Sequence, residues 1–197
     1  MSPVVHIAWG ASVTAGDIDR RVNAVADAAG FKAPSSWYTT DPLYWTGSGV
    51  TQALRFTNVT IPVGATITSA RLTVYTNANM GGASSNDKVR VRGEAADNPA
   101  AISSSSDAQT RYANLTTASV DWYVWEANGP ITGADQPVLS PSLNTVVQEL
   151  VDRVGWASGN AMLFFAHDLG TYDNSLAMRS YYNGASGTYP RLEVSWT

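Results

Sequence analysis

The sequence contains no cysteine and only two histidines, His6 and His167. Without cysteine, disulfides, thiolate catalysis and cysteine-ligated zinc sites are all excluded. Charged residues make up only 14% of the 197 residues, the net charge is −4, and the longest basic run is Arg20–Arg21. Because a protein that follows a nucleic-acid backbone needs many clustered cations, we expect no nucleic-acid partner.

Long apolar runs are also missing. No apolar stretch reaches the roughly 18 residues from which a membrane-spanning helix is recognised, so no membrane partner is expected. The opening MSPVVHIAWGASVTAGDIDRR lacks the basic start and apolar run of a secretory signal peptide. Together with the initial methionine, this favours a protein that reaches its destination without secretion, such as a virion protein assembled inside a host cell.

Motifs of known catalytic classes are absent as well. The sequence has no Gly-x-Ser-x-Gly elbow, no P-loop, no dinucleotide-binding glycine pattern and no histidine-rich metal motif. His167 precedes Asp168 at the end of an apolar run, where a structural hydrogen bond explains it better than a hydrolase triad. Glu94 with Asp97 or Glu126 could supply two carboxylates, yet nothing recommends them for glycosidase chemistry. We therefore predict no catalytic residue and a non-enzymatic protein.

What the sequence does contain is β-strand pattern. Segments 51–61 (TQALRFTNVTI) and 67–76 (ITSARLTVYT) alternate between two faces, which predicts two half-buried strands. Pro62 and Gly64 favour a short turn between these two strands. Further strands are predicted in KVRVRGE (88–94), SVDWYVWEA (119–127), AMLFFAHD (161–168, central to the sandwich), LAMRSYYNG (176–184) and PRLEVSWT (190–197).

One short α-helix is predicted near residues 141–154. Ser140 suits the N-cap, Pro141 suits the first helical position, and apolar residues recur at helical spacing after them. Gly155 can end this helix in the left-handed conformation. Stretch 95–111 is expected to be a loop, and 22–31 a strand that runs into a loop.

Strands that do not alternate with helices predict an all-β, antiparallel two-sheet β-sandwich, and a jelly roll is the common form at this size. We expect residues 1–20 to form an N-terminal arm and residues 21–197 to form the jelly-roll β-sandwich domain. The arm docks on its own domain or on a neighbouring subunit. The alternative is an edge strand added to the sheet.

The chain also resembles a family of bacterial jelly-roll modules. The residues that carry the resemblance are 54–75 (LRFTNVTIPVGATITSARLTVY), 89–100 (VRVRGEAADNPA), 143–165 (LNTVVQELVDRVGWASGNAMLFF) and 179–196 (RSYYNGASGTYPRLEVSW). The family comprises carbohydrate-binding-like or adhesive domains of secreted and surface proteins, and phage structural proteins contain related sandwiches. The resemblance covers roughly residues 22–197 and implies a binding or structural role. Many members of the family carry two adjacent acidic residues near the first strand. This chain has only Asp27 at that position.

Two aromatic segments are the candidate sites for a ligand or a partner. Exposed aromatic faces stack on sugars, and aromatic-rich loops also mark protein–protein contacts. The alternative is that a large sandwich buries its tryptophans in the core. The candidates in 35–49 (SSWYTTDPLYWTGSG) and 121–126 (DWYVWE) are Trp37, Tyr38, Asp41, Tyr44, Trp45, Trp122 and Trp125.

Two loops carry residues of the kind that bind calcium. GEAADN (93–98) and AHDLGTYDN (166–174) contain carboxylates and amides, which are calcium ligands. Such residues also serve loop turns, and we favour that role. No cofactor is predicted, calcium is the alternative, and no metal ligand is assigned.

These observations predict a non-enzymatic structural or adhesion protein of a virion. It would be a capsid decoration or a head or tail appendage. It would act through protein–protein contacts with other virion proteins and with itself as a homo-oligomer. The alternative is a secreted carbohydrate-binding module of a bacterial surface protein, with a glycan as its partner and an extracellular or cell-surface location.

Overall fold

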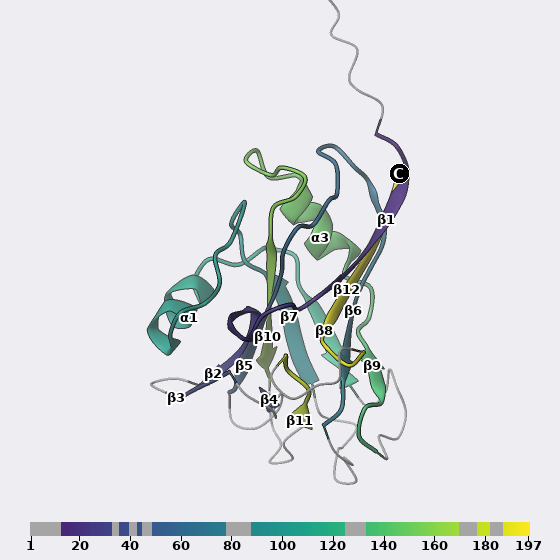
Figure 1. Ribbon diagram of the computed structural model, residues 1–197. Coiled ribbons are helices and arrows are strands. Elements are labelled where there is room, and N and C mark those ends of the chain that lie inside the picture. The colour runs from purple at the N-terminus through teal and green to yellow at the C-terminus, as the bar shows by residue number, and fades with distance from the viewer. Residues whose placement is uncertain are drawn as a thin grey trace, which may run out of the picture.

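A computed structural model describes residues 13–32, 36–39, 43–44, 49–77, 88–124, 133–169, 177–181 and 187–197. Within these ranges two antiparallel sheets face each other across a shared apolar core (Figure 1). The predicted all-β, two-sheet antiparallel sandwich is therefore confirmed at this level. No helix in the described ranges is long and apolar enough to cross a membrane.

The first sheet has four strands in the order β1-β12-β6-β9. Their bounds are β1 (Gly16–Arg21), β12 (Arg191–Trp196), β6 (Ile67–Tyr75) and β9 (Pro137–Leu139). β1 pairs with β12 along its whole length and forms one edge of this sheet. Residues 16–20 of the expected arm therefore belong to the sandwich as an edge strand, which was the alternative prediction. Residues 1–12 lie outside the described ranges.

The second sheet has six strands in the order β3-β2-β5-β10-β7-β8. β10 lies between β5 and β7, as its near-continuous apolar sequence predicts. A 3₁₀ turn, η1 (Val25–Asp27), precedes β2, and the short strands β4 (Leu43–Tyr44) and β11 (Ala177–Met178) pair with each other. The bounds are β2 (Ala28–Lys32), β3 (Ser36–Tyr38), β5 (Thr51–Phe56), β7 (Lys88–Gly93), β8 (Val120–Tyr123) and β10 (Met162–Asp168).

The segment between β5 and β6 crosses from one sheet to the other. Both strands form as predicted, but they are not paired, because β5 lies in the six-stranded sheet and β6 in the four-stranded sheet. The connection buries Val59, Ile61 and Ala65 at the end of the core. Gly64 adopts a positive φ of 78°, as the turn prediction requires.

The main core lies between the sheets and is closed at one end by helix α3 (Asn144–Val151). The helix is confirmed, but its predicted start and stop are wrong. Ser140 does not cap it, because Leu143 is the N-cap residue. Instead the N–H of Leu72 on β6 donates to Ser140 Oγ at 2.9 Å. α3 ends at Val151, and Gly155 is not among the residues with positive φ.

A second, smaller core lies on the outer face of the six-stranded sheet. Helix α1 (Ser105–Tyr112) covers it, where the sequence predicts only a loop. A capping pattern marks the start of α1, since Ser104 Oγ accepts from the N–H of Asp107 at 3.1 Å. The prediction fails because α1 is short and serine-rich, and Ala108 is its one buried residue, so it has no apolar stripe.

Gly93 at the end of β7 allows α3 to approach the sheet. A Cβ on Gly93 would lie 2.8 Å from Leu150 Cδ1 and 3.1 Å from Leu150 Cγ. Gly93→Ala is therefore expected to lower the free energy of unfolding by about 1–3 kcal/mol, because buried Leu150 must shift. Urea unfolding measures this loss. The control is Gly187→Ala, where a Cβ meets no atom within 4 Å. Equal losses in the two variants would contradict the close approach.

Candidate functional site

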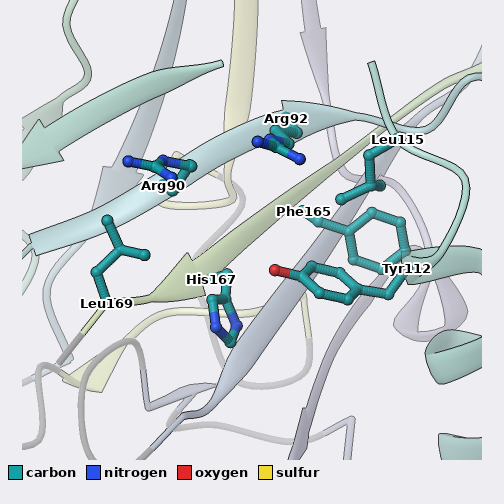
Figure 2. Close-up of a pocket in the computed structure, with 7 residues that line it drawn as sticks. All are labelled: Arg90, Arg92, Tyr112, Leu115, Phe165, His167 and Leu169. Atoms are coloured by element: carbon teal, nitrogen blue, oxygen red, sulfur yellow. The ribbon is translucent and has the colours of Figure 1, made fainter. Parts of the chain in front are cut away.

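A pocket of roughly 220 Å³ opens on the outer face of the six-stranded sheet, beside α1 (Figure 2). It combines cationic, phenolic and imidazole groups with an apolar wall. Its lining residues are Arg90, Arg92, Tyr112, Leu115, Phe165, His167 and Leu169. A second pocket of roughly 240 Å³, lined by Ser69, Arg71, Leu139 and Glu193 on the other sheet, has no aromatic or imidazole group among its described lining residues.

Strand alternation and register bring these side chains together. In β7 the two valines face the main core, so Arg90 and Arg92 face outward, as the alternation predicts. In the register between β10 and β7, His167 lies opposite Arg90 and Phe165 opposite Arg92. Tyr112 comes from α1, and its hydroxyl points into the space between these groups (Figure 2).

The two arginines of the pocket differ in their partners. Arg90 donates to both carboxylate oxygens of Asp121, with distances of 2.6 and 3.0 Å. These hydrogen bonds raise the pKa of Arg90 and lower the pKa of Asp121. The Nε of Arg92 is buried, and within the described ranges it has no hydrogen-bond partner. Arg92 therefore keeps donor capacity for a ligand, whereas Arg90 is committed to Asp121.

His167 stands on the floor of the pocket and is held in place by Thr51. Its Nδ1 lies 2.7 Å from Thr51 Oγ1, and its ring centroid lies 5.2 Å from that of Tyr112. Burial lowers the pKa of His167, and the nearby Arg90 lowers it further, while Asp168 acts in the opposite direction. The imidazole is therefore neutral near pH 7. Burial raises the pKa of the Tyr112 phenol, which keeps its proton as a donor.

The lowered pKa of His167 makes stability depend on pH. As pH falls, the unfolded chain binds a proton at about pH 6.5, before the folded protein does, so stability is lost below that pH. We expect His167→Gln to lose less stability than the parent between about pH 7.5 and 5. Urea midpoints at both values test this. His6 is present in both proteins and so does not distinguish them, and Asp121 loses its contribution only near or below about pH 4 because its pKa is lowered. Parallel pH profiles would contradict the buried, neutral state of His167.

Trp122 is the one sequence candidate whose side chain the structure describes, and it does not line this pocket. The backbones of Trp37 and Tyr38 lie in β3 and that of Tyr44 in β4, and the description does not extend to their side chains. Asp41, Trp45 and Trp125 lie outside the described residues.

Trp122 requires a correction as a candidate binding residue. Its side chain is 0% exposed and belongs to the main core. The alternation of β8 directs Trp122 inward and leaves its neighbour Tyr123 40% exposed. A buried ring has no free face for stacking on a ligand, so the alternative that the sandwich buries its tryptophans holds for this residue.

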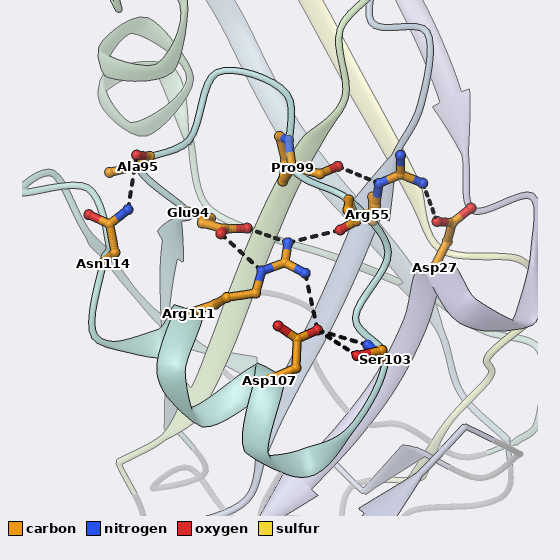
Figure 3. A network of polar contacts seen from close by, with 10 residues as sticks. Asp27, Arg55, Glu94, Ala95, Pro99, Ser103, Asp107, Arg111 and Asn114 are labelled. Atoms are coloured by element: carbon orange, nitrogen blue, oxygen red, sulfur yellow. Dashed lines mark hydrogen bonds and ion pairs between the residues drawn. The ribbon is translucent and has the colours of Figure 1, made fainter.

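The two carboxylates of the candidate calcium loop 93–98 form ion pairs with arginines, and Figure 3 shows that of Glu94. Glu94 pairs with Arg111 in two hydrogen bonds of 2.9 and 2.5 Å. Asp97 pairs with Arg153 at 2.7 Å. The network drawn in Figure 3 also includes Asp27, which pairs with Arg55 at 2.7 Å.

Asn98 of the first candidate calcium loop and Asp168 of the second also have protein partners. Asn98 Oδ1 accepts from the N–H of Ala161 at 2.9 Å, and Asp168 accepts from the N–H of Gly49 at 3.1 Å. No group of three or more histidine, aspartate or glutamate side chains that could hold a metal ion occurs within the described ranges. Residues 170–174 of the second loop lie outside those ranges.

The pocket was not identified from the sequence, although part of its signal is visible there. The alternation of KVRVRGE places Arg90 and Arg92 on one face, and His167 ends an apolar strand. Their proximity depends on the pairing of β7 with β10, and Tyr112 reaches them only through the unpredicted helix α1. No family model of known protein domains matches this chain, and no curated protein matches its sequence.

Proposed function

We propose that this chain is a non-enzymatic structural or adhesion protein of a virion. In this proposal it is a jelly-roll module that decorates a capsid or forms a head or tail appendage. It acts through protein–protein contacts with other virion proteins and with further copies of itself. The low charge of the chain and its resemblance to adhesive and phage jelly-roll modules agree with this role.

Strand pairing is the observation that carries the proposal. In a jelly roll one long hairpin wraps into two sheets, so that the first strand pairs with the last and the inner strands pair in turn. Here β1 pairs with β12, β5 with β10, β6 with β9, and β7 with β8. These pairs alternate between the two sheets, and β2 and β3 extend the larger sheet. This pattern supports the jelly-roll topology, which viral capsid and lectin domains use.

The non-enzymatic part of the proposal is supported by how the acidic side chains are used. Glu94, Asp97 and Asp121 each form an ion pair with an arginine. A glycosidase needs two carboxylates free to face a substrate, and a hydrolase triad needs an acid that orients the base. The Nδ1 of His167 instead contacts a threonine hydroxyl.

Sedimentation tests the virion role. Lysate from cells that produce the parent particle is fractionated, and this chain is followed by mass spectrometry. We expect it to sediment with particles, and the purified protein to form a stable oligomer in analytical ultracentrifugation. A protein that stays monomeric and never sediments with particles would overturn the proposal.

A secreted carbohydrate-binding module is the second candidate, and the outer-face pocket favours it. Tyr112 gives the pocket an aromatic wall beside polar donors, a combination that suits a sugar ring. Binding to a glycan array, lost in the variant Tyr112→Ala, would support this candidate. An array without signal, together with unchanged tryptophan fluorescence on added polysaccharides, would exclude it.

A further inference from the structure

We propose that the pocket lined by Arg92, Tyr112 and His167 binds a carboxylate carried on a compact, partly apolar organic group. Arg92 would hold the carboxylate, and the apolar wall would hold the rest of the ligand. This inference goes beyond the structural role proposed above and does not depend on it, since the pocket lies within a single chain.

The charge balance around the pocket favours a single negative charge. Lys88 Nζ and Arg90 Nε lie 3.7 and 2.6 Å from the carboxylate oxygens of Asp121. Asp168 adds a second negative charge beside His167. Together with Arg92, these groups leave one positive charge in excess at neutral pH. A monoanionic carboxylate neutralises that excess, whereas a dianionic phosphate would leave a buried negative charge without a partner.

The unmet hydrogen-bonding capacity points to the same ligand. Six other arginines form ion pairs: Arg55, Arg90, Arg111, Arg153, Arg179 and Arg191. Arg92 has no such pair with a described residue, and its buried Nε has no hydrogen-bond partner there. An unpaired buried donor is unfavourable, and the Arg92 guanidinium, which lines the pocket, would hold a ligand carboxylate through charge-assisted hydrogen bonds.

The other walls define the rest of the ligand. The volume of roughly 220 Å³ is about seven times the space that one water molecule occupies in the liquid, so only a small group fits. Phe165, Leu115 and Leu169 line it with apolar atoms. The Tyr112 hydroxyl and the Nε2 of neutral His167 add donor or acceptor capacity near the carboxylate (Figure 2).

Nuclear magnetic resonance of the labelled full chain tests the proposal. Sodium isobutyrate is titrated at pH 7 and constant ionic strength, and the Arg92 Nε–H and His167 ring signals are followed. We expect a saturable shift of both signals with isobutyrate. The neutral isostere isobutyramide is expected to cause none, and inorganic phosphate is expected to bind more weakly than isobutyrate.

Matched variants separate the pocket from general charge effects. Arg92→Gln is expected to weaken isobutyrate binding about tenfold or more, through the loss of a charged hydrogen bond. This variant should fold as well as the parent, because Arg92 forms no ion pair with any residue that the structure describes. Arg71→Gln removes an exposed arginine from the outer face of the other sheet and is expected to leave binding unchanged.

Several results would overturn the assignment. Shifts that rise linearly without saturation, or equal shifts with isobutyrate and isobutyramide, would show that no carboxylate site exists. Equal binding by the parent and Arg92→Gln would remove Arg92 from the site. Phosphate binding as tight as isobutyrate binding would contradict a carboxylate ligand. None of these results would affect the oligomer or particle measurements, so the two proposals can fail separately.

Discussion

Replacing Trp122 with alanine is expected to lower the free energy of unfolding by about 3–5 kcal/mol. The Trp122 side chain is fully buried between the sheets, in the same core cluster as Val89 and Val91. Its removal leaves a large cavity in a close-packed interior. Urea or guanidinium unfolding followed by circular dichroism measures the loss.

The neighbouring residue provides a control for Trp122. Tyr123 lies on the same strand, points to the other face and is 40% exposed. Tyr123→Ala is expected to cost about 1 kcal/mol or less, because its ring contributes little to the core. A small effect of Trp122→Ala on unfolding, combined with loss of binding to a glycan or a protein partner, would instead restore Trp122 as a binding residue.

The second large effect is expected from Arg111. Arg111→Met removes the partner of Glu94 and should lower the free energy of unfolding by about 3–5 kcal/mol. The side chains of Arg111 and Glu94 are only 14% and 7% exposed, so the remaining carboxylate would be buried without a charge partner. Arg111 also donates to the carbonyl of Ala100 at 2.9 Å, which ties helix α1 to the preceding loop.

A double-mutant cycle separates lost charge from lost packing at this pair. Adding Glu94→Leu to Arg111→Met is expected to recover part of the stability, since no unpaired charge then remains. The matched control is Arg153→Met, whose pair with Asp97 is 33% and 42% exposed. That variant should lose about 1 kcal/mol or less, because solvent screens an exposed pair. Equal losses at Arg111 and Arg153 would contradict a structural role for the buried pair.

Loss of the Arg111 pair should also change the outer-face pocket. Tyr112 follows Arg111 directly on α1 and packs against Phe165, with ring centroids 5.6 Å apart. If α1 loosens in Arg111→Met, the Tyr112 wall of the pocket moves with it. The isobutyrate titration of Arg111→Met therefore shows how displacement of the Tyr112 wall affects binding. Arg92→Gln, which leaves α1 in place, shows the effect of losing the guanidinium alone.

Local pattern alone was enough to predict most of the strands. Alternation of apolar and polar residues has a period of two, so it reports which residues face inward without knowledge of the partner strand. Alternation therefore predicts β5, β6, β7 and β12, and it places Arg90 and Arg92 on the face opposite to their flanking valines. A near-continuous apolar run predicts β10 instead. The same reasoning found α3 from its apolar stripe but missed α1, which has none.

Pairing and position required the tertiary structure. The strands before and after Gly64 read as neighbours, yet they lie in different sheets, because the linking segment buries Val59 and Ile61 rather than forming a tight hairpin. Trp122 illustrates the same limit within one strand. Alternation places the adjacent rings of Trp122 and Tyr123 on opposite faces, and only the packed sheets decide which of the two is enclosed.

The candidate site depends both on local sequence pattern and on tertiary packing. The sequence by itself determined that two arginines share one face of a strand and that a histidine ends another, since both are properties of neighbouring residues. Only the tertiary structure decided that His167 lies opposite Arg90 and that Tyr112 closes the pocket. Among the described residues, it also gives Arg92 no carboxylate partner, whereas Arg90 on the same strand has Asp121. Register between strands and the docking of a short helix arise from contacts between residues far apart in the chain, and periodicity carries no information about them.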